Sequence, residues 1–152
     1  MPTTNPYNQY KQTQITTANQ GKLIVMLYDG AIKFLNIAID NMEPKSYDVV
    51  NNNIIKAQDI ITELLLSLNM EDGGEISQNL FNLYMYFKRQ LLEANIKKDP
   101  EIIKHILKLL KELRDAWDQI SATETRADKN MNISSKGNFS IDSRTSDAIA
   151  LA

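Results

Sequence analysis

The only histidine in the chain, His105, is the first residue to test for chemistry, because imidazole can act as a general base or a metal ligand. Helical bundles that hold two metal ions place Glu-x-x-His motifs on two of their helices. Here Glu101 precedes His105 by four residues and the sequence has no second histidine. The pattern favours an ordinary helix-surface histidine over a metal ligand.

Other reactive residue types lack the neighbours that their chemistry needs. The serines Ser46, Ser67 and Ser77 lie in none of the strand-turn-helix contexts that expose a nucleophile. Gly73-Gly74 is not followed by the Lys-Ser/Thr of a phosphate-binding loop, and the adjacent Glu71-Asp72 is typical of a solvated turn. We therefore expect no catalytic, cofactor-binding or metal-binding residues and no enzymatic activity.

The composition is that of one globular domain. The chain has 152 residues, of which 43% are hydrophobic and 24% charged, and its formal net charge is −2. This balance argues against a nucleic-acid partner, whose phosphates require clustered positive charge. The sequence has no cysteine, opens without the apolar stretch of a secretory signal and has no run near the ~20 apolar residues of a membrane span. We expect a cytoplasmic protein without membrane insertion.

Four segments show the three-to-four-residue hydrophobic period of amphipathic helices. A Thr-x-x-Gln capping box at 17–20 opens the first segment, and Pro44 closes it. The second spans about 47–69, a Gly-Gly turn precedes the third, and Asp99-Pro100 supplies an N-cap and a first-turn proline for the fourth. The expected core stripes are Ile24, Tyr28, Ala31, Leu35, Ala38 and Met42; Val50, Ile54, Ala57, Ile61, Leu64 and Leu68; Ile76, Leu80, Leu83, Phe87, Leu91 and Ala94; and Ile103, Ile106, Leu110, Leu113, Trp117 and Ile120.

Short connections between four long helices favour antiparallel packing around one core. We therefore predict an all-α protein, an antiparallel up-and-down four-helix bundle over residues 17–120. Residues 1–16 have no helical period but hold Tyr7 and Tyr10, so we expect an extended N-terminal segment. Residues 121–152 are rich in Ser, Thr, Asn and Asp, which predicts a disordered polar tail.

Three helices carry apolar residues outside their main stripe, although a bundle helix needs only about three apolar positions in seven. Wider packing in the bundle, the N-terminal segment, another copy of the chain or a different protein could cover them. The two N-terminal tyrosines suit a removable cover, and permanent packing is the alternative. The extra residues are Leu23, Val25, Leu27, Phe34 and Ile37; Ile55, Ile60 and Leu65; and Ile102, Leu107 and Leu109.

Several motifs together resemble the flagellar secretion chaperone family FliS, in order and at family spacing from about residue 5 to 120. The N-terminal part contributes Asn5-Pro6-Tyr7-x-x-Tyr10, Thr17-Ala18 and the run from Leu23 to Gly30. The later helices contribute Lys56-Ala57-Gln58-Asp59-Ile60-Ile61-x-Glu63-Leu64, Leu83-Tyr84-x-Tyr86, Leu91-Leu92-x-Ala94-Asn95 and Leu113-Arg114-x-x-Trp117.

This resemblance implies a cytoplasmic four-helix chaperone that binds the disordered C-terminal region of flagellin, prevents premature polymerisation and passes the client to the flagellar type III export gate. It also implies that the N-terminal segment, here with Tyr7 and Tyr10, lies over part of the client groove. Spare apolar stripes, a detachable aromatic segment and no catalytic set agree with such a role.

The outer stripes and the motif positions together suggest where a client would touch the chain. Besides Tyr7 and Tyr10, we expect partner contacts at Leu27, Tyr28, Ile55, Gln58, Glu63, Leu91, Asn95 and Trp117. Trp117 also belongs to the main stripe of its helix, which favours core packing. The main alternative function is a self-associating bundle, a homodimeric structural or signalling module without a flagellin client.

Overall fold

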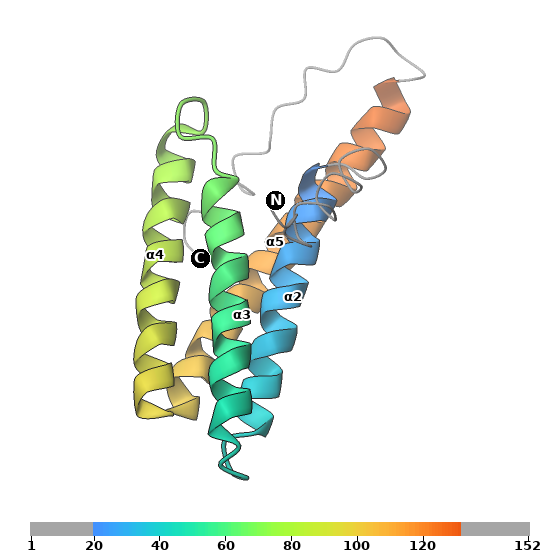
Figure 1. Cartoon of the computed structure of the whole chain (residues 1–152). Coiled ribbons are helices and arrows are strands. Elements are labelled where there is room, and N and C mark those ends of the chain that lie inside the picture. Colours follow the sequence, from blue (N-terminus) through green and yellow to red (C-terminus); the bar gives the residue numbers. More distant parts are fainter. Residues whose placement is uncertain (1–19, 132–152) are drawn as a thin grey trace, which may run out of the picture.

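A computed structural model describes residues 20–131, with side chains through residue 123. This part of the chain consists of α2 (Gln20–Asp40), α3 (Tyr47–Leu66), α4 (Gly74–Lys97) and α5 (Pro100–Met131). The helices form a ring in which α2 packs on α3, α3 on α4, α4 on α5 and α5 on α2. Consecutive helices run in opposite directions (Figure 1), so the predicted all-α up-and-down bundle is confirmed.

The predicted stripes fill the core of the ring. Most of their residues are buried, and Ile24, Leu68, Ile76, Leu83 and Trp117 pack against the core while partly exposed. Many of the extra apolar residues are covered as well. Leu23, Val25, Leu27, Ile60 and Leu107 are buried, and Phe34, Leu65, Ile102 and Leu109 pack against the core. The bundle thus covers most of the surplus by itself, whereas Ile55 is 42% exposed.

The connection between α4 and α5 is formed as the sequence predicts. Asp99 Oδ1 accepts a hydrogen bond from the Glu101 amide at 2.9 Å, which confirms the N-cap, and Pro100 is the first residue of α5. Lys98 closes α4 in the left-handed conformation, with φ of 52°. At the other end of α4, a Cβ on Gly73 would lie 2.5 Å from the Asn69 carbonyl oxygen, so that turn requires glycine.

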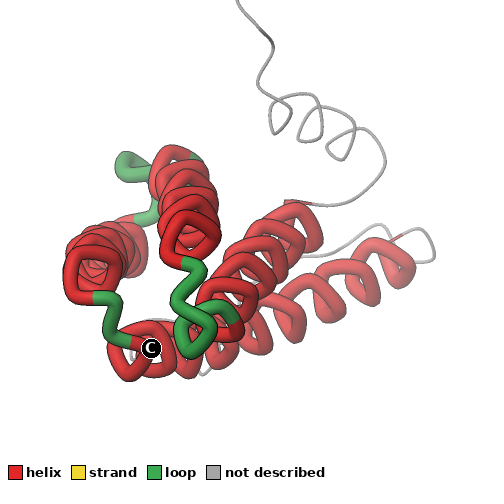
Figure 2. The backbone as a smooth tube through the Cα atoms, turned by 60° about the horizontal axis from the view of Figure 1, so that its bottom comes forward, coloured by secondary structure: helices red, strands yellow, loops and turns green. Residues whose placement is uncertain are grey.

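The fourth helix of the ring is longer than predicted and is inclined to its predecessor. From the connection with α4, α5 runs toward the N-terminal end of α2 and lies alongside that helix (Figures 1 and 2). It continues to Met131, past residue 120, where the bundle was predicted to end. The hydrophobic period of this helix ends at Ile120, but helix-forming residues such as Ala, Glu, Arg and Lys continue beyond it. The predicted capping box and the segments 1–19 and 132–152 lie outside the described residues.

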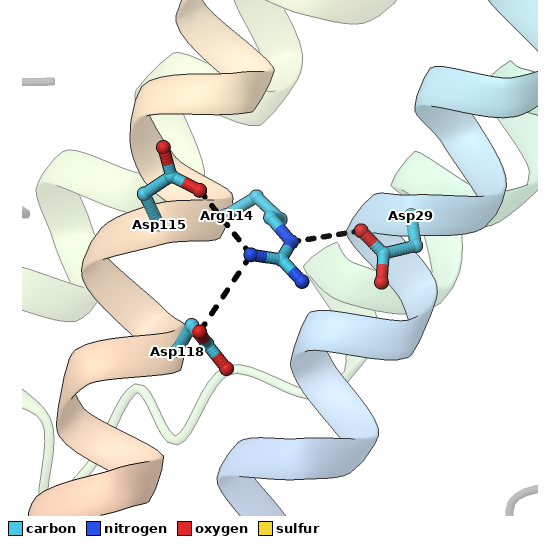
Figure 3. Close-up of polar contacts among 4 residues, drawn as sticks. All are labelled: Asp29, Arg114, Asp115 and Asp118. Atoms are coloured by element: carbon cyan, nitrogen blue, oxygen red, sulfur yellow. Dashed lines mark hydrogen bonds and ion pairs between the residues drawn. The ribbon is translucent and has the colours of Figure 1, made fainter.

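An arginine joins the two helices that close the ring (Figure 3). Arg114 Nε on α5 donates to Asp29 Oδ1 on α2 at 2.9 Å, while Nη1 lies 3.3 Å from Asp115 Oδ1 and 3.6 Å from Asp118 Oδ2. The hydrogen bond to Asp29 is the main reason that the pKa of Arg114 is raised. Because the four side chains are partly exposed, the cluster orients α5 more than it stabilises the fold.

Two tyrosines share a buried hydrogen bond across the centre of the bundle. The hydroxyl oxygens of Tyr28 on α2 and Tyr84 on α4 are 2.6 Å apart, and both side chains are almost completely buried. Burial raises the pKa of Tyr84 to about 12. Burial also raises the pKa of Tyr28 well above its ordinary value, with smaller contributions from Tyr84. This pair links two helices that are not neighbours in the ring.

We expect Tyr28→Phe and Tyr84→Phe each to lower the free energy of unfolding by about 1–2 kcal/mol, because each leaves the other hydroxyl buried without its partner. The double variant should lose less than the sum of the two, since it removes both hydroxyls. Urea denaturation followed by circular dichroism gives all three values. Additive losses would show that the two hydroxyls do not depend on each other.

The same pair predicts sensitivity to alkaline pH. Because both folded-state pKa values are raised, the two tyrosines favour the folded state below about pH 10, the ordinary tyrosine pKa. That contribution is lost as pH rises through 10 toward 12. The free energy of unfolding should therefore fall more steeply over this range in the wild-type chain than in the double Phe variant. Equal slopes would contradict the prediction.

Candidate functional site

Side-chain hydrogen bonds tie α3 to α4 along their shared seam. Asn95 Nδ2 donates to Asn51 Oδ1 at 2.8 Å. Further along, Gln58 Nε2 donates to the Lys88 carbonyl at 3.1 Å, and Lys88 Nζ donates to Thr62 Oγ1 at 2.7 Å. These bonds fix the register of the two antiparallel helices and mark the outer edge of their contact.

Apolar side chains are exposed between these polar links. On α3, Ile55 lies between Asn51 and Gln58 in the sequence, and on α4, Leu92 lies between Lys88 and Asn95. Leu92 is 54% exposed and Ile96, one turn further, is 74% exposed. The hydrogen-bonded register brings Ile55 and Leu92 to the same stretch of the seam, so apolar surface is available there to a partner.

A second apolar stripe runs along α4, separate from the one that enters the core. It comprises Phe81, Met85, Leu92 and Ile96, which we call the outer row; the first two side chains are partly buried and the last two are exposed. Offsets of four, eleven and fifteen residues place all four within one narrow band of a helix. Helix α4 therefore presents apolar residues in two directions.

Four expected contact residues of α3 and α4 have side chains that are partly or largely exposed: Ile55, Gln58, Glu63 and Asn95. The structure brings Ile55, Gln58 and Asn95 together on the seam. Leu91 is completely buried in the core, and it is the next residue, Leu92, that is exposed. For these positions, contact with a client stays a prediction.

The expected contacts on α2 lie inside the bundle. Tyr28 is completely buried and Leu27 is 7% exposed, and both belong to the core. A client on the surface of this conformation cannot touch Tyr28, so any influence of that residue on binding has to act through packing. Tyr7 and Tyr10 lie outside the described residues.

A cavity lies at the end of the bundle where α2 begins and α3 turns into α4. Its volume is about 370 Å³, close to the lower limit of the ~300–1,000 Å³ typical of ligand pockets. Its apolar lining comes from α2, α4, α5 and the α3–α4 turn: Ile24, Leu68, Ile76, Leu80, Tyr84 and Trp117. Toward this end of the bundle, α5 diverges from α4 (Figure 1).

Trp117 forms one side of this cavity and also packs against the core, so the predicted core position is confirmed. Its indole Nε1 is buried and makes no hydrogen bond of normal geometry among the described residues. Trp117 lowers the pKa of Tyr28, against the larger effect of burial, which raises it. Tyr84 therefore belongs both to the cavity lining and to the tyrosine pair.

The described part of the chain offers little for other chemistry. His105 is exposed, and its ring meets the ring of Tyr86 edge to face at 6.5 Å. Among the described side chains, no cluster of three His, Cys, Asp or Glu residues is placed to hold a metal ion. None of the four helices is both long and apolar enough to cross a bilayer.

The outer row was missed by sequence reasoning. The main stripe of α4 accounts for its amphipathic pattern, so the remaining apolar residues were not read as a second stripe. Their own spacing could have revealed them, because Phe81, Met85, Leu92 and Ile96 follow a helical period displaced to one side of the main stripe.

Comparisons with known proteins agree with the fold and the resemblance. The family model described as "Flagellar protein FliS" matches residues 3–124. The "Flagellar secretion chaperone FliS" of Bacillus subtilis (strain 168) is 38% identical over 122 residues, covering 80% of this chain and 90% of that relative. The proteins of the same description from Vibrio cholerae and Salmonella typhimurium are each 37% identical, covering 71% and 72% of this chain and 79% and 82% of the relatives. The chain therefore belongs to the FliS family of flagellar proteins.

Proposed function

We propose that this chain is a cytoplasmic flagellar export chaperone that binds the disordered C-terminal region of flagellin. Binding keeps the client from polymerising prematurely and presents it to the flagellar type III export apparatus. No reaction is catalysed. The proposal is supported by the relatives' description as flagellar secretion chaperones and by the family match over most of the chain.

The single observation that carries the proposal is the apolar surface on the α3–α4 seam, which the bundle leaves exposed. Ile55, Leu92 and Ile96 together offer what an amphipathic segment requires, while Gln58 and Asn95 at its edge are already hydrogen-bonded and hold the surface in place. A flagellin segment would bury its own apolar residues against this surface.

Disorder of the client makes such binding reversible. A flexible segment loses conformational entropy when it is ordered on the chaperone, so many apolar contacts give only moderate net affinity. Release at the export apparatus returns that entropy to the client. A chaperone of this kind needs a wide, preformed surface more than a deep pocket.

The N-terminal segment, residues 1–16, is proposed to compete with the client as a removable cover. It joins the bundle at the start of α2, where Ile24 lines the cavity at the same end. A tethered segment acts at high effective concentration and would weaken client binding by the fraction of time that it occupies the surface.

The exposed seam yields a direct test by calorimetric titration with the last ~40 residues of the cognate flagellin, a span typical of a segment that folds on binding. We expect Ile55→Asp and Leu92→Asp each to weaken binding at least about tenfold, because a charge would face the apolar client. The control is Met70→Asp, which changes a residue of similar exposure in the α3–α4 turn.

Light scattering on the same samples tests the alternative function. A wild-type chain that forms a stable dimer, ignores the flagellin segment and becomes monomeric in the Leu92→Asp variant would be a self-associating module. One-to-one binding by a monomer supports the chaperone, and unchanged affinity in both Asp variants would place the client elsewhere.

Deletion of residues 1–16 should tighten flagellin binding, because the competing segment is gone. The dissociation constant of the truncated chain, compared with that of the full chain, measures the effect. A lower melting temperature without any gain in affinity would instead show that the segment is a permanent part of the fold.

A further inference from the structure

Two cations interrupt the outer row of α4. Lys88 and Arg89 occupy the gap between Met85 and Leu92, and the 100° step between residues places one on each side of the row. Neither side chain forms an ion pair with a carboxylate among the described residues, although other basic residues of the bundle do. No carboxylate of the described residues therefore lies within ion-pair distance of the positive charge at the middle of this surface.

The two cations differ in how firmly they are held. Lys88 is partly buried and its Nζ is fixed by the hydrogen bond to Thr62 on α3, whereas Arg89 is exposed. Any partner that covers the apolar residues on both sides would also remove water from these charges. That desolvation is unfavourable unless the partner supplies an opposite charge at the same level.

The same charges argue against a second copy of the chain as the occupant. Two outer rows packed against each other would bring their central Lys88 and Arg89 together, and like charges at the centre of an interface are destabilising. The surface is complementary to a partner that is apolar toward both ends and acidic in the middle.

We propose that the outer row binds an amphipathic helix with apolar residues at relative positions 0, 4, 11 and 15 and a carboxylate near position 7 or 8, facing Lys88 and Arg89. This inference rests on the proposed function, because the bound helix is a segment of flagellin. Because the 4-7-4 spacing reads the same in both directions, the apolar contacts allow either orientation, and the central carboxylate sets the register.

The test uses the full-length chain and two synthetic helical peptides of identical composition. Both carry leucine at positions 0, 4, 11 and 15; one has two Glu in the centre and two Lys near its ends, and the other has these residues exchanged. We expect the peptide with central Glu to bind about three- to tenfold more tightly at low ionic strength. The difference should shrink in high salt, because partly exposed ion pairs are screened.

Substitutions in the chain identify where the preference arises. Arg89→Glu, which breaks no hydrogen bond or ion pair among the described residues, should remove or reverse the preference between the two peptides. Lys111→Glu makes the equivalent charge change at an exposed position of α5 and should leave the preference intact. Equal affinities for the two peptides, no binding of either, or a preference that survives Arg89→Glu would each overturn the inference.

Titration with the flagellin segment separates this inference from the proposed function. If flagellin binds and Arg89→Glu leaves its affinity unchanged, the chaperone function stands and the inference is wrong. If flagellin does not bind while the central-Glu peptide is still preferred, the proposed client is wrong and the acidic-helix site stands.

Discussion

A ring of four antiparallel helices can bury one broad face of each helix, and this limit governs the rest of the molecule. On α2, α3 and α5 the ring covers most of the apolar side chains, including several that lie outside the main stripes. On α4 it covers the stripe that contains Phe87 and Leu91, while Leu92 and Ile96 remain outside. The large apolar side chains that stay exposed in the described residues lie on α3, on α4 and in the turn between them.

The polar contacts of the bundle are placed where they orient helices. The bonds from Asn95 and Gln58 hold α3 and α4 in register, and Arg114 holds α5 against α2 (Figure 3). With α5 held to α2 and inclined to α4, the end of the bundle lined by Trp117 contains a cavity, whereas the opposite end is closed by the short connection at Lys98 and Asp99. Orientation of α5 and access to the cavity are thus linked.

Sequence periodicity predicted the fold well because burial of one stripe per helix is encoded locally. The start of α5 was also predicted correctly, because the Asp99-Pro100 signal is local in the sequence. The exposed surface was harder to predict, because the sequence of a helix with apolar residues on several sides does not show which side its neighbours will cover. Leu91 and Leu92 are adjacent and chemically identical, yet one is in the core and the other is 54% exposed. They lie about 100° apart around the helix, and Leu91 falls on the predicted core stripe whereas Leu92 does not.

The ring is closed by its most distant contacts in sequence, those between α2 and α5, where Asp29 and Arg114 lie 85 positions apart. The other helix pairs are neighbours along the chain, so they can associate as soon as each hairpin is made. During synthesis, the core faces of α2, α3 and α4 are not covered by α5 until nearly all of that helix has left the ribosome. The chain thus passes through a stage in which its own interior is uncovered, and rapid docking of its last helix ends that exposure.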